Sequence, residues 1–122
     1  MKESLFIFMV SLLLIHEMDA IRAKEWKMFV FLEDMADELA CKVFMLAHLP
    51  LYFAARFLLV QGGITTSAIL YYVLDIFLIG HALIHFGFRK HKNNGFTSAL
   101  SKTFIYTPTA LGVIHLLLVL SA

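Results

Sequence analysis

The sequence predicts an all-α fold, an integral membrane four-helix bundle that forms a single domain over residues 1–122. Two observations carry this prediction. Of the 122 residues, 61% are hydrophobic and only 16% are charged, and the mean hydropathy is +0.82, which is far more apolar than a soluble domain. The apolar residues form long runs without the alternation that the strands of a closed barrel need, so the runs are expected to be helices.

Each apolar run is close to the length of about 17 to 25 residues that a helix needs to cross hydrocarbon. Charged residues, a glycine pair and a basic loop separate the runs, and such segments commonly end helices. The separating segments are residues 22–27, 61–63 and 89–95. The predicted spans are residues 5–21, 39–60, 64–88 and 103–122.

The first run could also be read as a cleaved signal peptide, because its purely apolar part, Leu5–Ile15, is short and follows Lys2. The residues after it argue against cleavage. The run ends in His16-Glu17-Met18-Asp19 rather than in small residues, and Ala20-Ile21-Arg22-Ala23 is a poor cleavage site. We therefore expect this segment to be retained as a helix.

Basic residues predict the orientation of the bundle, because cytoplasmic connections of membrane proteins carry an excess of Lys and Arg. Of the ten basic residues, Lys2 and Arg56 lie on one side, and the remaining eight flank the first and third connections. The eight are Arg22, Lys24, Lys27, Lys42, Arg89, Lys90, Lys92 and Lys102. We therefore expect a multi-pass protein of the cell membrane with both termini on the outer side.

The charge and the cysteine content exclude several classes of function. A formal net charge of +1, without a basic stripe interleaved with aromatic residues, gives no basis for a nucleic-acid partner. The single cysteine, Cys41, cannot form an internal disulfide or a zinc knuckle. The expected partners are the lipid bilayer and, for an enzyme, a lipid-like small molecule, while oligomer formation stays open.

Ionisable side chains inside the apolar runs are the candidates for function, because such a group facing lipid costs several kcal/mol. Each run carries at least one histidine. At about 1.5 Å per residue, His16 lies roughly 7 Å deep, His81 about 10 Å, His48 about 13 Å and His115 about 13 to 18 Å. His85 follows His81 by one helical turn on nearly the same face. The imidazoles of four helices thus share one broad layer.

This layer predicts a site for a divalent transition metal, zinc or iron. Imidazoles at i and i+4 on one helix, completed by imidazoles and carboxylates from facing helices, are what such a site requires in a bundle. For one histidine alone, a hydrogen bond is the simpler interpretation, and only the convergence of four helices favours metal. The candidate ligands are His16, Glu17, Asp19, Glu25, His48, His81, His85 and His115.

Several further residues carry expectations. Asp75, near the middle of the third span, needs a polar partner, and the sequence leaves several open. His91 lies in the basic loop and is expected to be solvated. Gly80, Gly87 and Gly112 are candidates for close helix contacts, and one is expected at Gly80 because it directly precedes His81. The candidate partners of Asp75 are Tyr71, Tyr72, Thr109 and Arg56.

Other chemistries lack their motifs. The sequence has no G-x-S-x-G, no glycine-rich phosphate loop and no H-E-x-x-H, and its six histidines are fewer than membrane di-iron oxygenases use. Two alternatives to the metal site stay open. One is a haem b electron carrier with axial histidines from two facing helices. The other is a non-catalytic membrane subunit whose histidines only join helices by hydrogen bonds.

Three short motifs resemble those of a known group. His16-Glu17-Met18-Asp19, then Glu25-Trp26, then His81-x-x-x-His85 are similar to the small prokaryotic membrane proteins called the HXXEE-type family. The resemblance implies a four-helix membrane protein with a metal site and no established reaction. No Glu-Glu pair follows His16 closely, so Glu17, Asp19 or Glu25 would stand in for it.

Together these patterns predict a four-helix membrane protein with a metal site on its cytoplasmic side. If it is an enzyme, the metal is expected to activate water or oxygen at the membrane boundary, where a lipid-like substrate can reach it. The sequence does not identify the reaction.

Overall fold

The computed structural model describes residues 2–61 and 64–121, with side chains for 2–57 and 68–121. This part of the chain contains four α-helices, two short 3-10 helices and no strand, so the predicted all-α fold is confirmed. The elements are α1 (Lys2–Ala23), η1 (Glu25–Met28), α2 (Asp37–Gln61), α3 (Ile64–Gly87), η2 (Phe88–Lys90) and α4 (Ala99–Leu120).

Each predicted span corresponds to one helix, and each helix is long and apolar enough to cross a membrane. The largest difference is at α4, which begins at Ala99 instead of residue 103. The cause is an N-cap that the hydropathy pattern does not reveal, in which the Ser98 hydroxyl accepts a hydrogen bond of 3.0 Å from the Ser101 amide. The turn predicted at residues 61–63 falls largely on Gly62 and Gly63, which lie outside the described residues.

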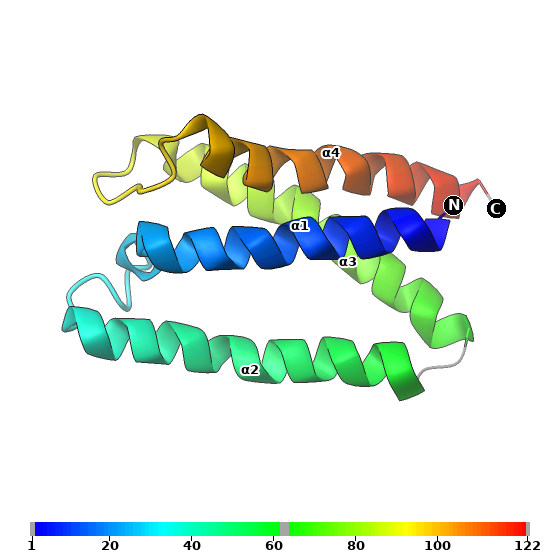
Figure 1. The fold of residues 1–122 in the computed structure, drawn as a ribbon, viewed down its shortest axis with the longest axis horizontal. Coiled ribbons are helices and arrows are strands. Elements are labelled where there is room, and N and C mark those ends of the chain that lie inside the picture. Colours follow the sequence, from blue (N-terminus) through cyan, green and yellow to red (C-terminus); the bar gives the residue numbers. More distant parts are fainter. Residues whose placement is uncertain (1, 62–63, 122) are drawn as a thin grey trace.

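The helices are not equally packed (Figure 1). α1 and α4 run antiparallel along each other, and α3 packs obliquely against α4. α2 lies at the edge of the bundle, where it contacts α3 and η1. Both chain ends lie at one end of the bundle, and the connections that contain η1 and η2 lie at the other.

The buried core has two parts. Near the connections, Ala20, Ala40 and Ala82 let the helices approach, and the larger Trp26 and Phe96 fill the space between them. The Trp26 indole donates a hydrogen bond of 3.0 Å to Asp37, which ties η1 to the start of α2. Nearer the termini, a second group packs α1 against α3: Phe6, Met9, Leu70 and Leu78.

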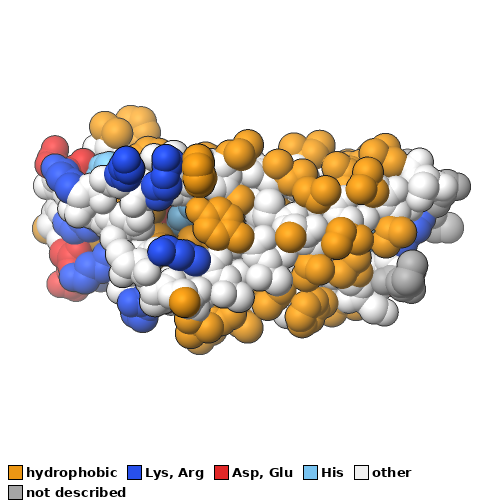
Figure 2. Space-filling view, turned by 90° about the horizontal axis from the view of Figure 1, so that it is seen from above, with side chains coloured by type: hydrophobic (Ala, Val, Ile, Leu, Met, Phe, Trp, Pro, Cys, Tyr) orange, Lys and Arg blue, Asp and Glu red, His pale blue; other side chains and the backbone are white. Residues whose placement is uncertain are grey.

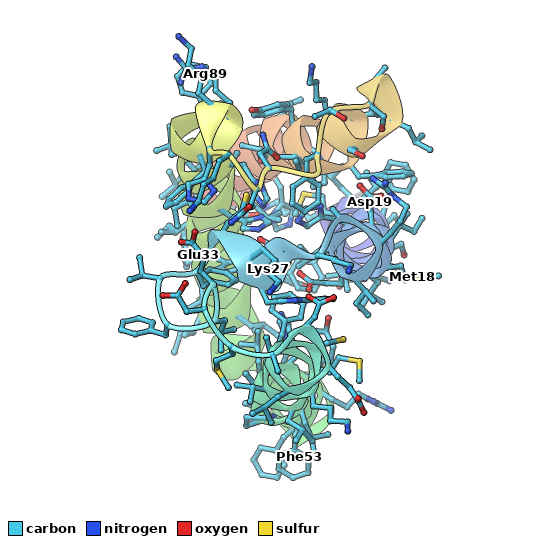
Figure 3. All side chains as sticks on the ribbon, turned by 90° about the vertical axis from the view of Figure 1, so that its left-hand side faces the viewer. Met18, Asp19, Lys27, Glu33, Phe53 and Arg89 are labelled. Atoms are coloured by element: carbon cyan, nitrogen blue, oxygen red, sulfur yellow. The ribbon has the colours of Figure 1, made fainter. Side chains whose placement is uncertain are left out.

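The surface divides into a charged end and an apolar body. Lys, Arg, Asp and Glu gather around the connections, and hydrophobic side chains cover much of the rest of the visible face (Figure 2). Met18 on α1 is 72% exposed and Phe53 on α2 is 69% exposed, and both point away from the bundle (Figure 3). Large exposed apolar side chains of this kind are suited to contact with lipid.

The expected helix contact at Gly80 is wrong. Among the described residues, no heavy atom apart from the neighbouring backbone of α3 itself lies within 4 Å of where a Cβ would stand at Gly80. The close contact is at Gly112 on α4, where a Cβ would lie 3.5 Å from Leu78. Gly80 comes two residues after Leu78, roughly 200° further round α3, so it lies on another face of that helix.

Gly95 makes a second close contact, between the connection that precedes α4 and the end of α1. A Cβ at Gly95 would overlap the backbone of Ala23, so only glycine fits there without a shift. The adjacent residue, Phe96, is thereby held against the core.

Candidate metal centre

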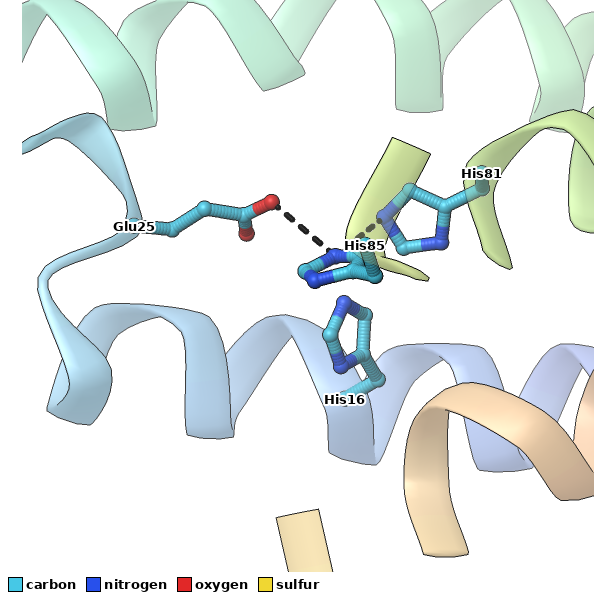
Figure 4. A group of neighbouring side chains, drawn as sticks. All are labelled: His16, Glu25, His81 and His85. Atoms are coloured by element: carbon cyan, nitrogen blue, oxygen red, sulfur yellow. Dashed lines mark hydrogen bonds and ion pairs between the residues drawn. The ribbon is translucent and has the colours of Figure 1, made fainter. Parts of the chain in front are cut away.

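Four side chains converge between α1, η1 and α3 (Figure 4). His16, Glu25, His81 and His85 each offer one nitrogen or oxygen atom, and these four atoms all lie within 4.8 Å of one another. Three of the side chains are buried and His81 is half-buried. These four residues are called the His/Glu cluster below.

The backbone explains how each member reaches the cluster. His81 and His85 are one turn apart on α3, so their imidazoles lie on one face of the helix. Glu25 reaches it because Lys24, which directly follows α1, has a left-handed conformation with φ 54° and ψ 52°. This turn starts η1, and the Glu25 side chain points back toward His85 (Figure 4).

Two distances in the His/Glu cluster are close to those of a metal shell. The Nε2 atom of His85 lies 3.0 Å from Nε2 of His81 and 3.3 Å from Oε1 of Glu25. Metal bonds of about 2.0 to 2.1 Å in tetrahedral geometry place ligand atoms roughly 3.3 to 3.4 Å apart. The ring of His16 completes the group, with its centroid 4.9 Å from that of His81 and 5.1 Å from that of His85.

Hydrogen bonding alone satisfies this group poorly. A neutral imidazole carries one N–H, and an ionised carboxylate carries none. If Nε2 of His85 is the donor, its single proton must serve both His81 and Glu25; if Nε2 of His81 donates to it instead, no proton is left for Glu25. A cation placed between the same atoms would instead meet a lone pair from each.

His16 is the most unusual member. It is fully buried, and within the described part of the chain neither ring nitrogen has a hydrogen-bond partner. A buried polar group without a partner costs about 1 to 3 kcal/mol. Its neighbours are the rings of His81, His85 and Phe96, so a cation held by the first two could also bind a nitrogen of His16.

Glu25 is held in the form that binds metal. Burial raises the pKa of the Glu25 carboxyl, but the hydrogen bond with His85 and the attraction of the three imidazoles outweigh burial and hold the pKa below its usual range. Glu25 is therefore a carboxylate at neutral pH, which is the form that ligates a divalent cation.

Glu17 and His48 lie beside the cluster as a separate pair. The Nδ1 atom of His48 is 2.7 Å from the carbonyl oxygen of Phe44, to which it must donate because a carbonyl only accepts. Its Nε2 atom is 3.1 Å from the Glu17 carboxyl group, and that contact needs one more proton. Both nitrogens of His48 are thus engaged, and the pair joins α2 to α1.

Asp19 faces α4 instead of the cluster. Nε of Arg22 donates to Asp19 at 2.6 Å, and Nη2 of Arg22 donates to the hydroxyl of Ser101 at 3.1 Å. This chain of contacts ties the end of α1 to the start of α4.

His115 pairs with Asp75 in a second buried site between α4 and α3, at 2.8 Å. This partner of Asp75 was not among those considered from the sequence. Thr109 instead donates to the carbonyl oxygen of Leu78 at 3.0 Å. His91, expected to be solvated, is half-buried, and its Nδ1 accepts from the amide of Asn93 at 3.2 Å.

The structure therefore brings together four of the eight predicted ligands. His16, Glu25, His81 and His85 form the cluster. The other four are engaged elsewhere, in the contacts just described: Glu17, Asp19, His48 and His115.

Four apolar helices around a group of buried imidazoles define the class of this chain as a small helical protein with a candidate metal centre. The chain belongs to a family of unknown function, DUF6713, whose model matches residues 2–122. No curated protein and no solved structure matches the chain. The family match does not confirm the resemblance to the HXXEE-type family, which stays a prediction.

Proposed function

We propose that this chain is a multi-pass protein of the cell membrane that binds one divalent transition metal ion, zinc or iron, through His16, Glu25, His81 and His85. The observation that carries the proposal is the pair of unpartnered nitrogens on buried His16, next to three other donor groups. Three imidazoles and one carboxylate suit either metal.

The charge distribution supports a cytoplasmic position for the connections. The connections that carry η1 and η2 share one end of the bundle, and the charged side chains gather there (Figures 1 and 2). Under the positive-inside rule this end faces the cytoplasm, which places both termini outside and the His/Glu cluster near the cytoplasmic boundary.

The donor set is compatible with catalysis. Catalytic zinc sites commonly use three protein ligands and leave a position for water, whose pKa falls to about 7 on the metal. His16, His81 and His85 supply three imidazoles, and the Glu25 carboxylate lies close enough to act either as a fourth ligand or as a base for that water. We propose activation of water or oxygen toward a lipid-like substrate as the reaction class.

Haem b is a less suitable occupant of this site. The rings of His81 and His85 are 4.5 Å apart between centroids, and His16 lies within 5.1 Å of both. These rings would have to separate before a porphyrin could enter between any two of them.

Metal analysis of the purified protein tests the proposal. We expect zinc or iron at about one ion per chain, and loss of most of that metal in His16→Ala, His81→Ala and His85→Ala. The double variant of His81 and His85 should be little worse than either single variant, because one lost ligand already leaves an incomplete shell. His91→Ala, outside the cluster, is the matched control and should keep its metal.

Two outcomes would overturn the proposal. Full metal content in the double variant of His81 and His85 would leave these histidines as hydrogen-bonding groups only. A Soret band in the purified protein, lost in the same variants, would identify haem instead.

A further inference from the structure

A cavity of about 600 Å³ lies beside the His/Glu cluster, between the end of α3, η2 and the start of α4. Its volume is within the range of about 300 to 1,000 Å³ that is usual for small-molecule sites. Three basic side chains line it: Arg89 and Lys90 from η2, and Lys102 from α4. This cavity is called the basic pocket below.

These three cations differ from the other basic residues at this end of the bundle. All nine acidic side chains of the chain lie in its described part, yet none approaches Arg89, Lys90 or Lys102 within the 4.0 Å of an ion pair. The other five basic residues there each have an acidic partner. The pairs are Arg22–Asp19, Lys24–Asp37, Lys27–Asp37, Lys42–Glu38 and Lys92–Glu33.

Arg89 is partly fixed in position while most of its donors stay free. Its guanidinium lies 3.9 Å from the centre of the Phe86 ring, and its Nη1 donates to the carbonyl oxygen of Phe86 at 2.7 Å. Residues that carry one guanidinium and two ammonium groups line the same cavity, and such a set of donors suits a phosphate group, which accepts several charge-assisted hydrogen bonds.

The same pocket has an apolar wall. Phe86 and Tyr106 line it and are 53% and 39% exposed, and Ile105 lines it from the core. Cations together with exposed aromatic rings fit a molecule that joins an anionic group to a hydrocarbon chain. A free phosphate ion would leave the apolar wall unused.

The pocket adjoins the candidate metal centre. His85 lines the pocket and also belongs to the His/Glu cluster. Phe96 lies between the two, with its ring centroid 4.8 Å from that of His85 and 5.3 Å from that of His16. A ligand in the pocket would therefore lie against a metal-binding side chain.

We propose that the basic pocket binds the phosphate headgroup of a phosphorylated lipid, with Arg89, Lys90 and Lys102 on the phosphate and Phe86 and Tyr106 along the chain. A phosphorylated lipid would then be the substrate class of the metal centre. This part of the inference rests on the proposed function. The binding step itself involves side chains outside the four proposed ligands.

Calorimetric titration of the detergent-solubilised full chain tests the proposal. The probe is a short-chain phosphatidic acid, compared with the diacylglycerol of the same chains and with inorganic phosphate. We expect the phosphatidic acid to bind much more tightly than either. Arg89→Gln, Lys90→Gln and Lys102→Gln should each weaken its binding about tenfold, because each removes a charge-assisted contact.

Lys42→Gln and Lys92→Gln are matched controls, because each removes one positive charge at the same end of the bundle outside the pocket. Both should keep the affinity within about twofold of the parent protein. Equal weakening in the control and pocket variants would overturn the proposal by showing unspecific attraction. Inorganic phosphate binding as tightly as the lipid would overturn it in favour of a simple phosphate site.

The His81→Ala variant separates this proposal from the metal proposal, because His81 belongs to the cluster and does not line the pocket. Lost metal with retained lipid binding in that variant would support both. A parent protein that holds metal at His81 but binds no phosphatidic acid would overturn the lipid pocket alone. A parent protein that binds the lipid but contains no metal would overturn the metal centre alone.

Discussion

The Nδ1 atom of His115 on α4 lies 2.8 Å from Oδ2 of Asp75 on α3, and both side chains are fully buried. The rings of His115 and Tyr71 pack edge to face, with their centroids 5.2 Å apart. The pair joins the two helices at a point where Gly112 lets them approach. Together with the hydrogen bond from Thr109 to the carbonyl oxygen of Leu78, it is a polar contact in a largely apolar helix interface.

The losses of unfolding free energy caused by replacing the two partners of this pair should not be additive. Asp75→Ala leaves the buried His115 without its partner, and an unpaired buried polar group costs about 1 to 3 kcal/mol. His115→Ala should cost a similar amount, and the double variant should cost clearly less than the sum, since no polar group is then stranded. Thermal unfolding in detergent measures all three. Additive costs would show that the two side chains act independently.

The Glu17–His48 pair should hold α2 in place without binding metal. α2 has few other contacts with α1, so Glu17→Gln and His48→Ala should increase amide hydrogen exchange in α2 while α1 and α4 stay protected. Metal content should stay near that of the parent protein. If either variant loses its metal, the residue is a ligand and the arrangement described above is incomplete.

Gly95→Ala should damage the protein, whereas Gly80→Ala should not. The added methyl group at Gly95 meets the backbone of Ala23, and relief of such overlap costs about 1 to 3 kcal/mol. The shift would move Phe96 relative to His85, so we also expect weaker metal binding. Gly80→Ala meets open space inside a helix and should be neutral or stabilising by up to about 1 kcal/mol. Unfolding curves and metal content compare the two.

The orientation of the bundle predicts the location of the C-terminus. A reporter enzyme fused after Ala122 should be active only outside the cytoplasm, because the basic residues gather at the opposite end of the bundle. A second fusion, inserted between Asn93 and Asn94, should behave in the opposite way. Activity of the first fusion in the cytoplasm would show that the bundle has the opposite orientation, with the His/Glu cluster on the outer side.

Hydropathy and residue spacing were sufficient to predict the four helices. The i, i+4 spacing of His81 and His85 also placed both on one face of α3. Spacing alone does not show which neighbour a helix face meets. His48 and His115 were predicted in the same layer as His16. His48 turns toward Glu17 instead, and His115 lies nearer the termini, beside Phe6 and Asp75, because the packing of α2 and α4 determines which neighbours they meet.

The basic pocket could not be predicted for a similar reason. Arg89, Lys90 and Lys102 were informative in the sequence only as charges near the membrane surface. Their lack of acidic partners becomes visible only once Lys92, in the same connection, is seen to pair with Glu33 from a segment far away in the chain. Phe96 gave no signal either, since its contacts with His16 and His85 join different elements of the fold.

The packing of α4 has a consequence for the order of biogenesis. All four donors of the His/Glu cluster lie before residue 86, but α1 and α3 are held together mainly through α4, which contributes no donor. During synthesis the four donor residues are therefore made before the helix that assembles them into one site. Insertion of α4 is the step that brings His16 to the imidazoles of α3, so metal binding should follow the insertion of α4 and not precede it.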